Sequence, residues 1–144
     1  MKKITIYIDG GSRGNPGPSA LGVLFLSEKG ETLKEYSQFL GEKTNNEAEY
    51  EALIFALQKA KVLFGKKEAK NLSLEIKSDS QLLVEQMSGQ YKIKNPNIQK
   101  LFLLAWNLKI DFNQVIFLHI DRERNKEADG LVNEALDSKG NRLF

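Results

Sequence analysis

Alternation between apolar and polar residues predicts a β-strand at the start of the chain. Isoleucine occupies positions 4, 6 and 8, so one face of an extended segment is apolar and the opposite face ends in Asp9. Asp9 is expected at the end of this strand, because residues 10–17 contain four glycines and are typical of a loop. Residues 20–27 and 32–40 predict two further strands, which are joined by a turn and lie antiparallel to the first.

Residues 44–47, with the sequence TNNE, predict the start of the longest helix. They match a capping box, in which the threonine oxygen and the glutamate three residues later bond free backbone N–H groups. Apolar residues at helical spacing continue to Gly65, which is expected to end the helix. After a polar loop at 66–71, an alternating segment predicts a fourth strand that ends at Ser78 and Asp79. This strand is expected to lie parallel to the first, because a long helix connects the two halves of the sheet.

The rest of the chain predicts three helices and a fifth strand. A short helix is expected over 80–87, capped by a serine, and a longer one over 96–108, opened by Asn95 and a proline. Residues 114–120 predict the fifth strand, and a charged loop follows it. Asn125 is expected to cap the last helix, whose apolar face extends to position 136.

Composition limits the class of protein more than it identifies one. A length of 144 residues, with 41% hydrophobic and 28% charged residues, suits a single globular domain over 1–144, with residues 138–144 as a flexible tail. The net charge of +2 is small, so nucleic-acid binding would need a local basic patch. The absence of cysteine excludes disulfides and thiolate chemistry and is typical of a cytoplasmic protein. Neither a signal peptide nor a membrane span fits the sequence.

Four acidic residues, Asp9, Glu49, Asp79 and Asp129, stand at or near the ends of predicted elements. Taken singly they have ordinary explanations, because Glu49 and Asp129 suit the first turns of helices and Asp9 and Asp79 suit turns. Brought together, they would repel one another unless a cation lay among them. Oxygen ligands in this number favour magnesium or manganese, and two such ions can clamp the attacking water and the leaving oxygen of a phosphodiester.

The residues around the four acids resemble the motifs of a known family. The acids lie in four motifs: DGGSxGNPG at 9–17, TNNxxE at 44–49, SDSQ at 78–81 and NxxAD at 125–129. In this order they resemble the motifs of type 1 ribonuclease H, and the resemblance extends from Ile4 to Leu136. It implies an α/β protein with the ribonuclease H-like fold: a five-stranded mixed sheet flanked by helices. Strands 1–3 are antiparallel, and strands 4 and 5 are parallel to the first.

The resemblance also implies an activity and its residues. The activity is hydrolysis of the RNA strand of an RNA–DNA hybrid with two Mg²⁺ ions, for which Mn²⁺ can substitute, leaving 5′-phosphate and 3′-hydroxyl ends. The four acids correspond to catalytic metal ligands, and Asp9 is expected to bridge both ions. Residues assigned to the hybrid's minor groove, where 2′-hydroxyl groups distinguish RNA from DNA, are Gly11, Ser12, Asn15, Asn46 and Gln81. Asn45 and Ser80 are expected to have structural roles only.

The histidine that many family members carry in a loop before the last acid has no clear counterpart. His119, the only histidine, lies ten residues before Asp129 and inside the predicted fifth strand. It is therefore expected to be an ordinary strand residue, which leaves the proton shuttle unassigned. Arg122 or Arg124 can act there only electrostatically, because arginine does not release its proton.

The basic protrusion with which some members grip DNA is also short. Residues 90–99 supply only Lys92 and Lys94, so binding is expected to be weak and sensitive to salt. The sequence is similar to the compact form of the family, without the protrusion and without a preceding hybrid-binding domain, and a monomer is expected. Two alternatives stay open: the same chemistry on double-stranded RNA or RNA–DNA junctions, and a hybrid-binding module without activity.

Overall fold

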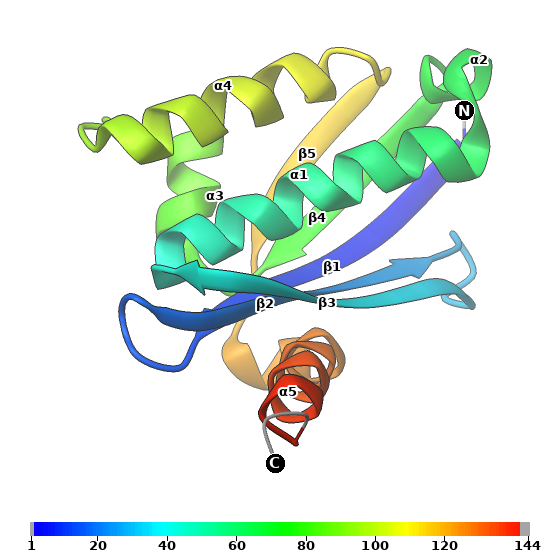
Figure 1. Cartoon of the computed structure of the whole chain (residues 1–144). Helices are drawn as coiled ribbons and strands as arrows, with labels where there is room; N and C mark the ends of the chain where they lie inside the picture. Colours follow the sequence, from blue (N-terminus) through cyan, green and yellow to red (C-terminus); the bar gives the residue numbers. More distant parts are fainter. Residues whose placement is uncertain (1, 142–144) are drawn as a thin grey trace.

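A five-stranded mixed sheet forms the centre of the molecule, and the computed structural model describes residues 2–141 of the chain. The strands lie in the order β3-β2-β1-β4-β5, with β1 antiparallel to β2, β2 antiparallel to β3, and β1, β4 and β5 parallel (Figure 1). This is the sheet that the resemblance implies, so that prediction is confirmed. The strands span β1 Lys2–Ser12, β2 Gly17–Leu26, β3 Thr32–Lys43, β4 Leu72–Ser78 and β5 Gln114–His119.

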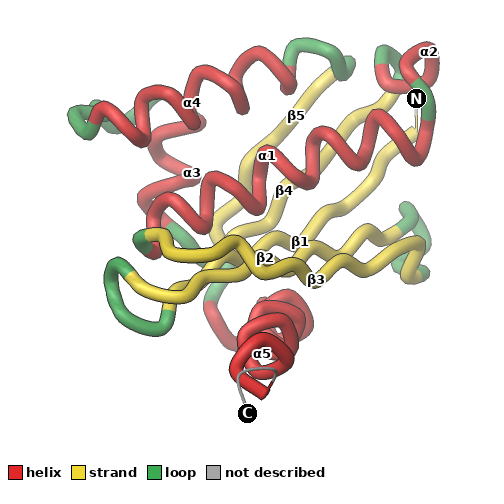
Figure 2. The backbone as a smooth tube through the Cα atoms, in the orientation of Figure 1, coloured by secondary structure: helices red, strands yellow, loops and turns green. Residues whose placement is uncertain are grey.

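Helices cover the two faces of the sheet unequally. The long helix α1, with α3 and α4 beside it, lies on one face, and α5 lies on the other (Figures 1 and 2). Helix α5 packs against β1, β2 and β3. Within residues 2–141, no helix is both long and apolar enough to span a membrane. The helices span α1 Asn45–Phe64, α2 Lys66–Ala69, α3 Gln81–Met87, α4 Pro96–Lys109 and α5 Lys126–Asn141, with a 3₁₀ turn η1 at Arg122–Asn125.

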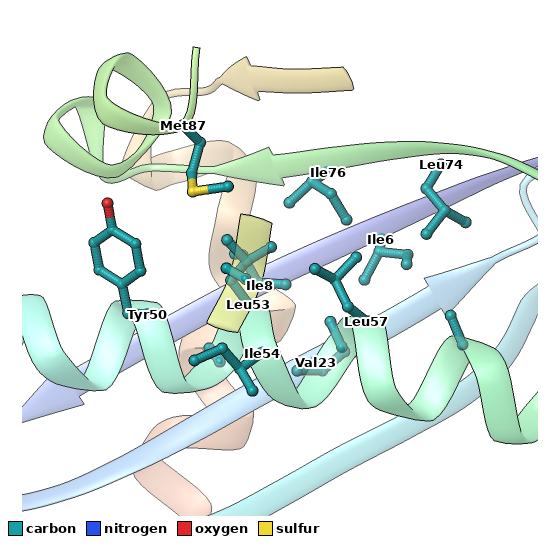
Figure 3. Close-up of a cluster of buried hydrophobic side chains, with 14 of the residues drawn as sticks. Ile6, Ile8, Val23, Tyr50, Leu53, Ile54, Leu57, Leu74, Ile76 and Met87 are labelled. Carbon is teal, nitrogen blue, oxygen red and sulfur yellow. The ribbon is translucent and has the colours of Figure 1, made fainter. Parts of the chain in front are cut away.

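The hydrophobic core lies between α1 and the sheet. The isoleucines at positions 4, 6 and 8 of β1 are fully buried, as the period of two predicts, and so are alternate residues of β4. Leu53 and Leu57, four residues apart on α1, belong to the same buried cluster (Figure 3). Burial of this cluster fixes α1 across β1, which places the first turns of the helix beside the far end of that strand.

Several predicted boundaries are wrong, and the most important one concerns β1. The strand does not end at Asp9 but continues to Ser12, because residues 5–12 pair with β2. Strand β2 correspondingly begins at Gly17 and β3 ends at Lys43, so the expected loop shrinks to 13–16. Hydrogen bonding to a neighbouring strand therefore overrides the preference of glycine for loops.

Smaller differences occur elsewhere. The expected polar loop after α1 contains the single helical turn α2, and the charged loop after β5 is the 3₁₀ turn η1. Helix α5 continues to Asn141, so residues 138–141 are helical and only 142–144 of the expected tail lie outside the described residues. His119 is the last residue of β5, as predicted from its apolar neighbours.

The helix caps follow the sequence except at α5. The Thr44 hydroxyl accepts from the Glu47 N–H at 3.1 Å and the Glu47 carboxylate accepts from the Thr44 N–H at 2.9 Å, so the capping box is confirmed. Ser80 caps α3 and Asn95 caps α4. The prediction that Asn125 caps the last helix is wrong. It lies at the end of η1, and its side-chain amide bonds the sheet instead.

Candidate active site

The four predicted acids line one cavity at the end of β1 and β4. This cavity, here called the acid pocket, has a volume of about 530 Å³ and is bordered by the first turns of α1 and α5. The strands bring Asp9 and Asp79 together, because Asp9 follows the last β1–β4 pair and Asp79 follows the last residue of β4. The lining residues are Asp9, Gly10, Gly11, Ser12, Arg13, Asn45, Asn46, Glu49, Asp79, Ser80, Leu82, Arg122, Asp129, Val132, Asn133 and Leu136.

Close contact between β1 and α1 positions Glu49. The Gly10 N–H donates to the Glu49 carboxylate at 3.2 Å, across the interface between strand and helix. A Cβ atom at Gly10 would overlap the backbone of Ala48 and Glu49, so only glycine permits this approach. The glycine after Asp9 is therefore a packing requirement of the site and does not form a loop.

The electrostatic setting of Asp9 and Glu49 is unfavourable for two negative charges. Both are buried, with 6% and 8% of their surfaces exposed. Burial, with a contribution from the charge of Asp79, raises the pKa of Asp9 to about 7. Burial and the charges of Asp9 and Asp79 raise the pKa of Glu49 well above its ordinary value. One oxygen of Glu49, Oε2, is buried with no hydrogen-bond partner in the described part of the chain.

Three of the acids are close enough to share a cation. Asp9, Glu49 and Asp79 each offer a carboxylate oxygen, and these oxygens lie within 4.8 Å of one another. Asp129 lines the same pocket from the first turn of α5 but is exposed and stands outside this group of three. Hard oxygen donors and an unpartnered carboxylate oxygen suit a divalent cation such as magnesium or manganese.

The residues assigned to the minor groove fall into two groups. Gly11, Ser12 and Asn46 line the acid pocket, whereas Asn15 and Gln81 are not among its lining residues within 2–141. The Asn15 Oδ1 accepts from the Asn45 N–H at 3.0 Å, and so helps to start α1. The Gln81 side chain donates to Glu85 at 3.1 Å.

Asn45 and Asn46, at the start of α1, both line the acid pocket. The Asn45 Oδ1 accepts from the Ser12 N–H at 2.9 Å and so joins α1 to the end of β1, although Asn45 also lines the pocket. The Asn46 Oδ1 is buried without a partner among the described residues. Asn46 lines the pocket as a half-buried residue, but this oxygen is not exposed to it.

Asn133 and Arg13 line the pocket without having been predicted. Asn133 follows Asp129 by one helical turn, with its amide nitrogen 3.5 Å from an Asp129 oxygen. Helical spacing from Asp129 would have indicated this residue. Arg13 carried no comparable signal, because its position depends on the unexpected length of β1.

A second hollow adjoins the acid pocket and shares Asn46 and Leu82 with it. This lysine groove has a volume of about 500 Å³ and includes an exposed aromatic residue, Tyr91, with 57% of its surface accessible. Its lining residues are Asn46, Leu82, Gln86, Gln90, Tyr91, Lys92, Ile93, Lys94, Asn95 and Ile98. The two lysines of the short segment 90–99 therefore line a hollow that adjoins the acid pocket.

This strand order and this acid pocket together define a ribonuclease H-like protein. The family described as reverse transcriptase-like matches residues 7–135. The crystal structure of LC11-RNase H1, isolated from compost by a metagenomic approach, is 47% identical, with a TM-score of 0.89 over 96% of this chain and 99% of that one. The chain belongs to the ribonuclease H type 1 family, as the four motifs predict.

Other relatives support this assignment and differ in length. The RNase H1 structure from Halobacterium salinarum is 38% identical, with a TM-score of 0.86 over 94% of this chain and 98% of that one. A bifunctional protein of Mycobacterium tuberculosis is 43% identical over 94% of this chain but only 36% of its own length. The chain thus spans about a third of the length of that relative. LC11-RNase H1 has also been solved in complex with an RNA/DNA hybrid. That structure has a TM-score of 0.90 over 94% of this chain and 98% of that one.

Proposed function

We propose that this chain is an endoribonuclease that hydrolyses the RNA strand of RNA–DNA hybrids and leaves 5′-phosphate and 3′-hydroxyl ends. The observation that carries the proposal is the convergence of carboxylate oxygens from Asp9, Glu49 and Asp79 within 4.8 Å. The hybrid complex of LC11-RNase H1, at 47% identity, supports the class of substrate.

Asp9, Glu49 and Asp79 would hold Mg²⁺, or Mn²⁺ in its place, with Asp129 as the ligand contributed by α5. The Glu49 Oε2 supports this assignment, because a buried carboxylate oxygen without a partner is costly unless a cation binds it. When bound, two divalent ions supply a water nucleophile at neutral pH and stabilise the leaving oxygen. The Gly10 N–H, which bonds the other oxygen of Glu49, holds this carboxylate toward the pocket.

The pocket wall suits the minor groove of a hybrid. Gly11 lets the duplex approach the backbone, and Asn46, which is half-buried in the pocket wall, would contact a ribose 2′-hydroxyl. DNA lacks this hydroxyl, so the contact favours the RNA strand. Ser12, Asn15 and Gln81 would contact nucleotides nearby, with Asn15 using its NH₂ group because its oxygen already bonds α1.

The position of His119 does not favour it as the proton shuttle. His119 is exposed at the end of β5 and is not among the pocket's lining residues in the described part of the chain. Arg122 does line the pocket and would stabilise phosphate charge. Since arginine stays protonated, water would carry protons to and from the reacting oxygens.

The lysine groove would hold the DNA strand. Lys92 and Lys94 offer two positive charges to phosphates, and Tyr91 offers an exposed ring against which a sugar or base can pack. With only two lysines, the affinity should depend on salt with a modest slope. A cytoplasmic location and a monomeric state stay predictions.

The deciding experiment is a cleavage assay with labelled hybrid, double-stranded RNA, double-stranded DNA and single-stranded RNA, each with Mg²⁺, Mn²⁺ or chelator. We expect cleavage of the RNA strand of the hybrid only, with either metal, and 5′-phosphate ends when the cuts are mapped. Cleavage of double-stranded RNA would widen the class of substrate. Binding of the hybrid without cleavage of any duplex would contradict the proposal and indicate a hybrid-binding module.

A further inference from the structure

Asn125 hydrogen-bonds one of the acids and is almost fully buried, with 1% of its surface accessible. Its side-chain nitrogen donates to the Ile8 carbonyl oxygen at 2.8 Å and to the Asp79 Oδ2 at 3.1 Å. An amide nitrogen carries two hydrogens, so each acceptor takes one of them. A single side chain from η1 therefore bonds both the backbone of β1 and the carboxylate that follows β4.

The position of this amide coincides with the end of the β1–β4 ladder. The last pair between the two strands is Ile8 with Ser78, and beyond it the chain continues on either side to Asp9 and Asp79. With β4 no longer paired there, the Asn125 amide supplies the donor for the Ile8 carbonyl. Because that carbonyl belongs to the peptide that leads into Asp9, the bond also fixes the backbone from which Asp9 projects.

The second hydrogen acts on Asp79 directly. Asp79 follows the last residue of β4 and is only half-buried, so the strand alone does not determine how its carboxylate turns. The bond from Asn125 to Oδ2 selects one orientation of that carboxylate. Asn125 also precedes Asp129 by four residues, so its attachment to β1 fixes the start of α5 relative to the acid pocket.

The oxygen of the Asn125 side-chain amide makes no such contribution. Its Oδ1 is buried and has no hydrogen-bond partner within residues 2–141. An apolar side chain would avoid the cost of this buried oxygen. The presence of an amide at this position is therefore explained by the two hydrogen bonds that its nitrogen donates.

We infer that Asn125 is a positioning residue that holds Asp9 and Asp79 at the separation at which they bind one divalent cation together. This inference rests on the proposed function. It assigns to Asn125 no contact with substrate or metal. Groups that orient metal ligands in this way affect metal affinity by roughly 10- to 100-fold.

The test is substitution by a residue of similar size without hydrogen-bonding groups, Asn125→Leu, with Asn107→Leu on the exposed face of α4 as the matched control. Affinity for Mg²⁺ and Mn²⁺ is measured by calorimetry without nucleic acid, and hybrid cleavage is measured over a range of metal concentrations. We expect about tenfold or greater loss of metal affinity in Asn125→Leu and none in Asn107→Leu. At saturating metal, kcat should recover to within a few-fold and the KM for the hybrid should be unchanged.

The outcomes separate this inference from the proposed function. If folded Asn125→Leu binds metal like the unaltered protein and only unfolds at a lower temperature, Asn125 is merely structural and the inference is wrong. If the unaltered protein binds neither metal, the proposed function fails first. If Asn125→Leu does not fold, the inference is tested by NMR of the unaltered protein instead. The two side-chain amide hydrogens of Asn125 should shift when Mg²⁺ is added, and unchanged signals would overturn the inference.

Discussion

The acid pocket and the lysine groove adjoin each other and share Asn46 and Leu82, yet they are built in opposite ways. In the acid pocket the central carboxylates are buried, and the glycine backbone at Gly10 holds one of them. In the lysine groove the charged and aromatic groups, Tyr91, Lys92 and Lys94, are exposed.

In this assignment the buried acids would carry out the reaction, and the exposed lysines would bind the nucleic-acid backbone. Burying like charges together is costly, so the fold must hold the carboxylates through many fixed contacts. Small displacements of these carboxylates should therefore lower the rate of cleavage. Exposed lysines on a short segment adjust to a phosphate backbone, and losing one should weaken binding without altering the reaction. Substitutions in the two hollows should accordingly change kcat and KM independently.

The largest effect is expected for Asp9→Asn. The substitution keeps the size of the side chain but removes the central charge of the acid group, and metal-assisted stabilisation of the reaction is worth several kcal/mol. Cleavage should fall by roughly a thousandfold or more. Affinity for an uncleaved hybrid, measured by fluorescence anisotropy in chelator, should change little, because the lysine groove is intact. Retained cleavage would remove Asp9 from the reaction.

Gly10→Ala should damage the acid pocket through packing. The added methyl group would overlap the backbone of Ala48 and Glu49, so β1 and α1 must separate. We expect a loss of about 2 kcal/mol or more in the free energy of unfolding, measured with urea, together with weaker metal binding. Gly11→Ala is the matched control, since its methyl group would meet only a Val132 side-chain carbon, at 3.3 Å. Equal losses in the two variants would contradict the role assigned to Gly10.

These two glycines also show which features a sequence pattern does not predict, namely contacts between segments that are far apart in the chain. The caps of α1, α3 and α4 and the buried alternation of β1 are local signals, and each identified its element correctly. The continuation of β1 to Ser12 depends on pairing with β2 and on the crossing of α1 at Gly10, which are contacts between distant segments. The same holds for Asn125, which resembles a helix cap in sequence but bonds residues 117 positions and 46 positions away.

A smaller effect is expected from pH on the metal-free protein. The ordinary pKa of Asp9 is 3.8, and in the fold it is raised to about 7, so the folded state binds more protons between these values. This contribution to stability is present below about pH 4 and is lost as the pH rises through 7. Relative to Asp9→Asn, the unaltered protein should lose melting temperature between pH 5 and pH 8. Mg²⁺ should restore more of it at pH 8 than at pH 5, and equal effects at both pH values would contradict the cost assigned to the buried acids.

The smallest effect is expected in the lysine groove. Lys92→Gln with Lys94→Gln removes two phosphate contacts, so the KM for the hybrid should rise several-fold while kcat stays within a factor of about two. The slope of log affinity against log salt should become shallower by about 1 to 2, because fewer counterions are released on binding. Lys66→Gln with Lys67→Gln on α2 changes the net charge equally but lies outside both hollows. If both pairs altered KM alike, the effect would reflect net charge, and the groove would lose its assignment to the DNA strand.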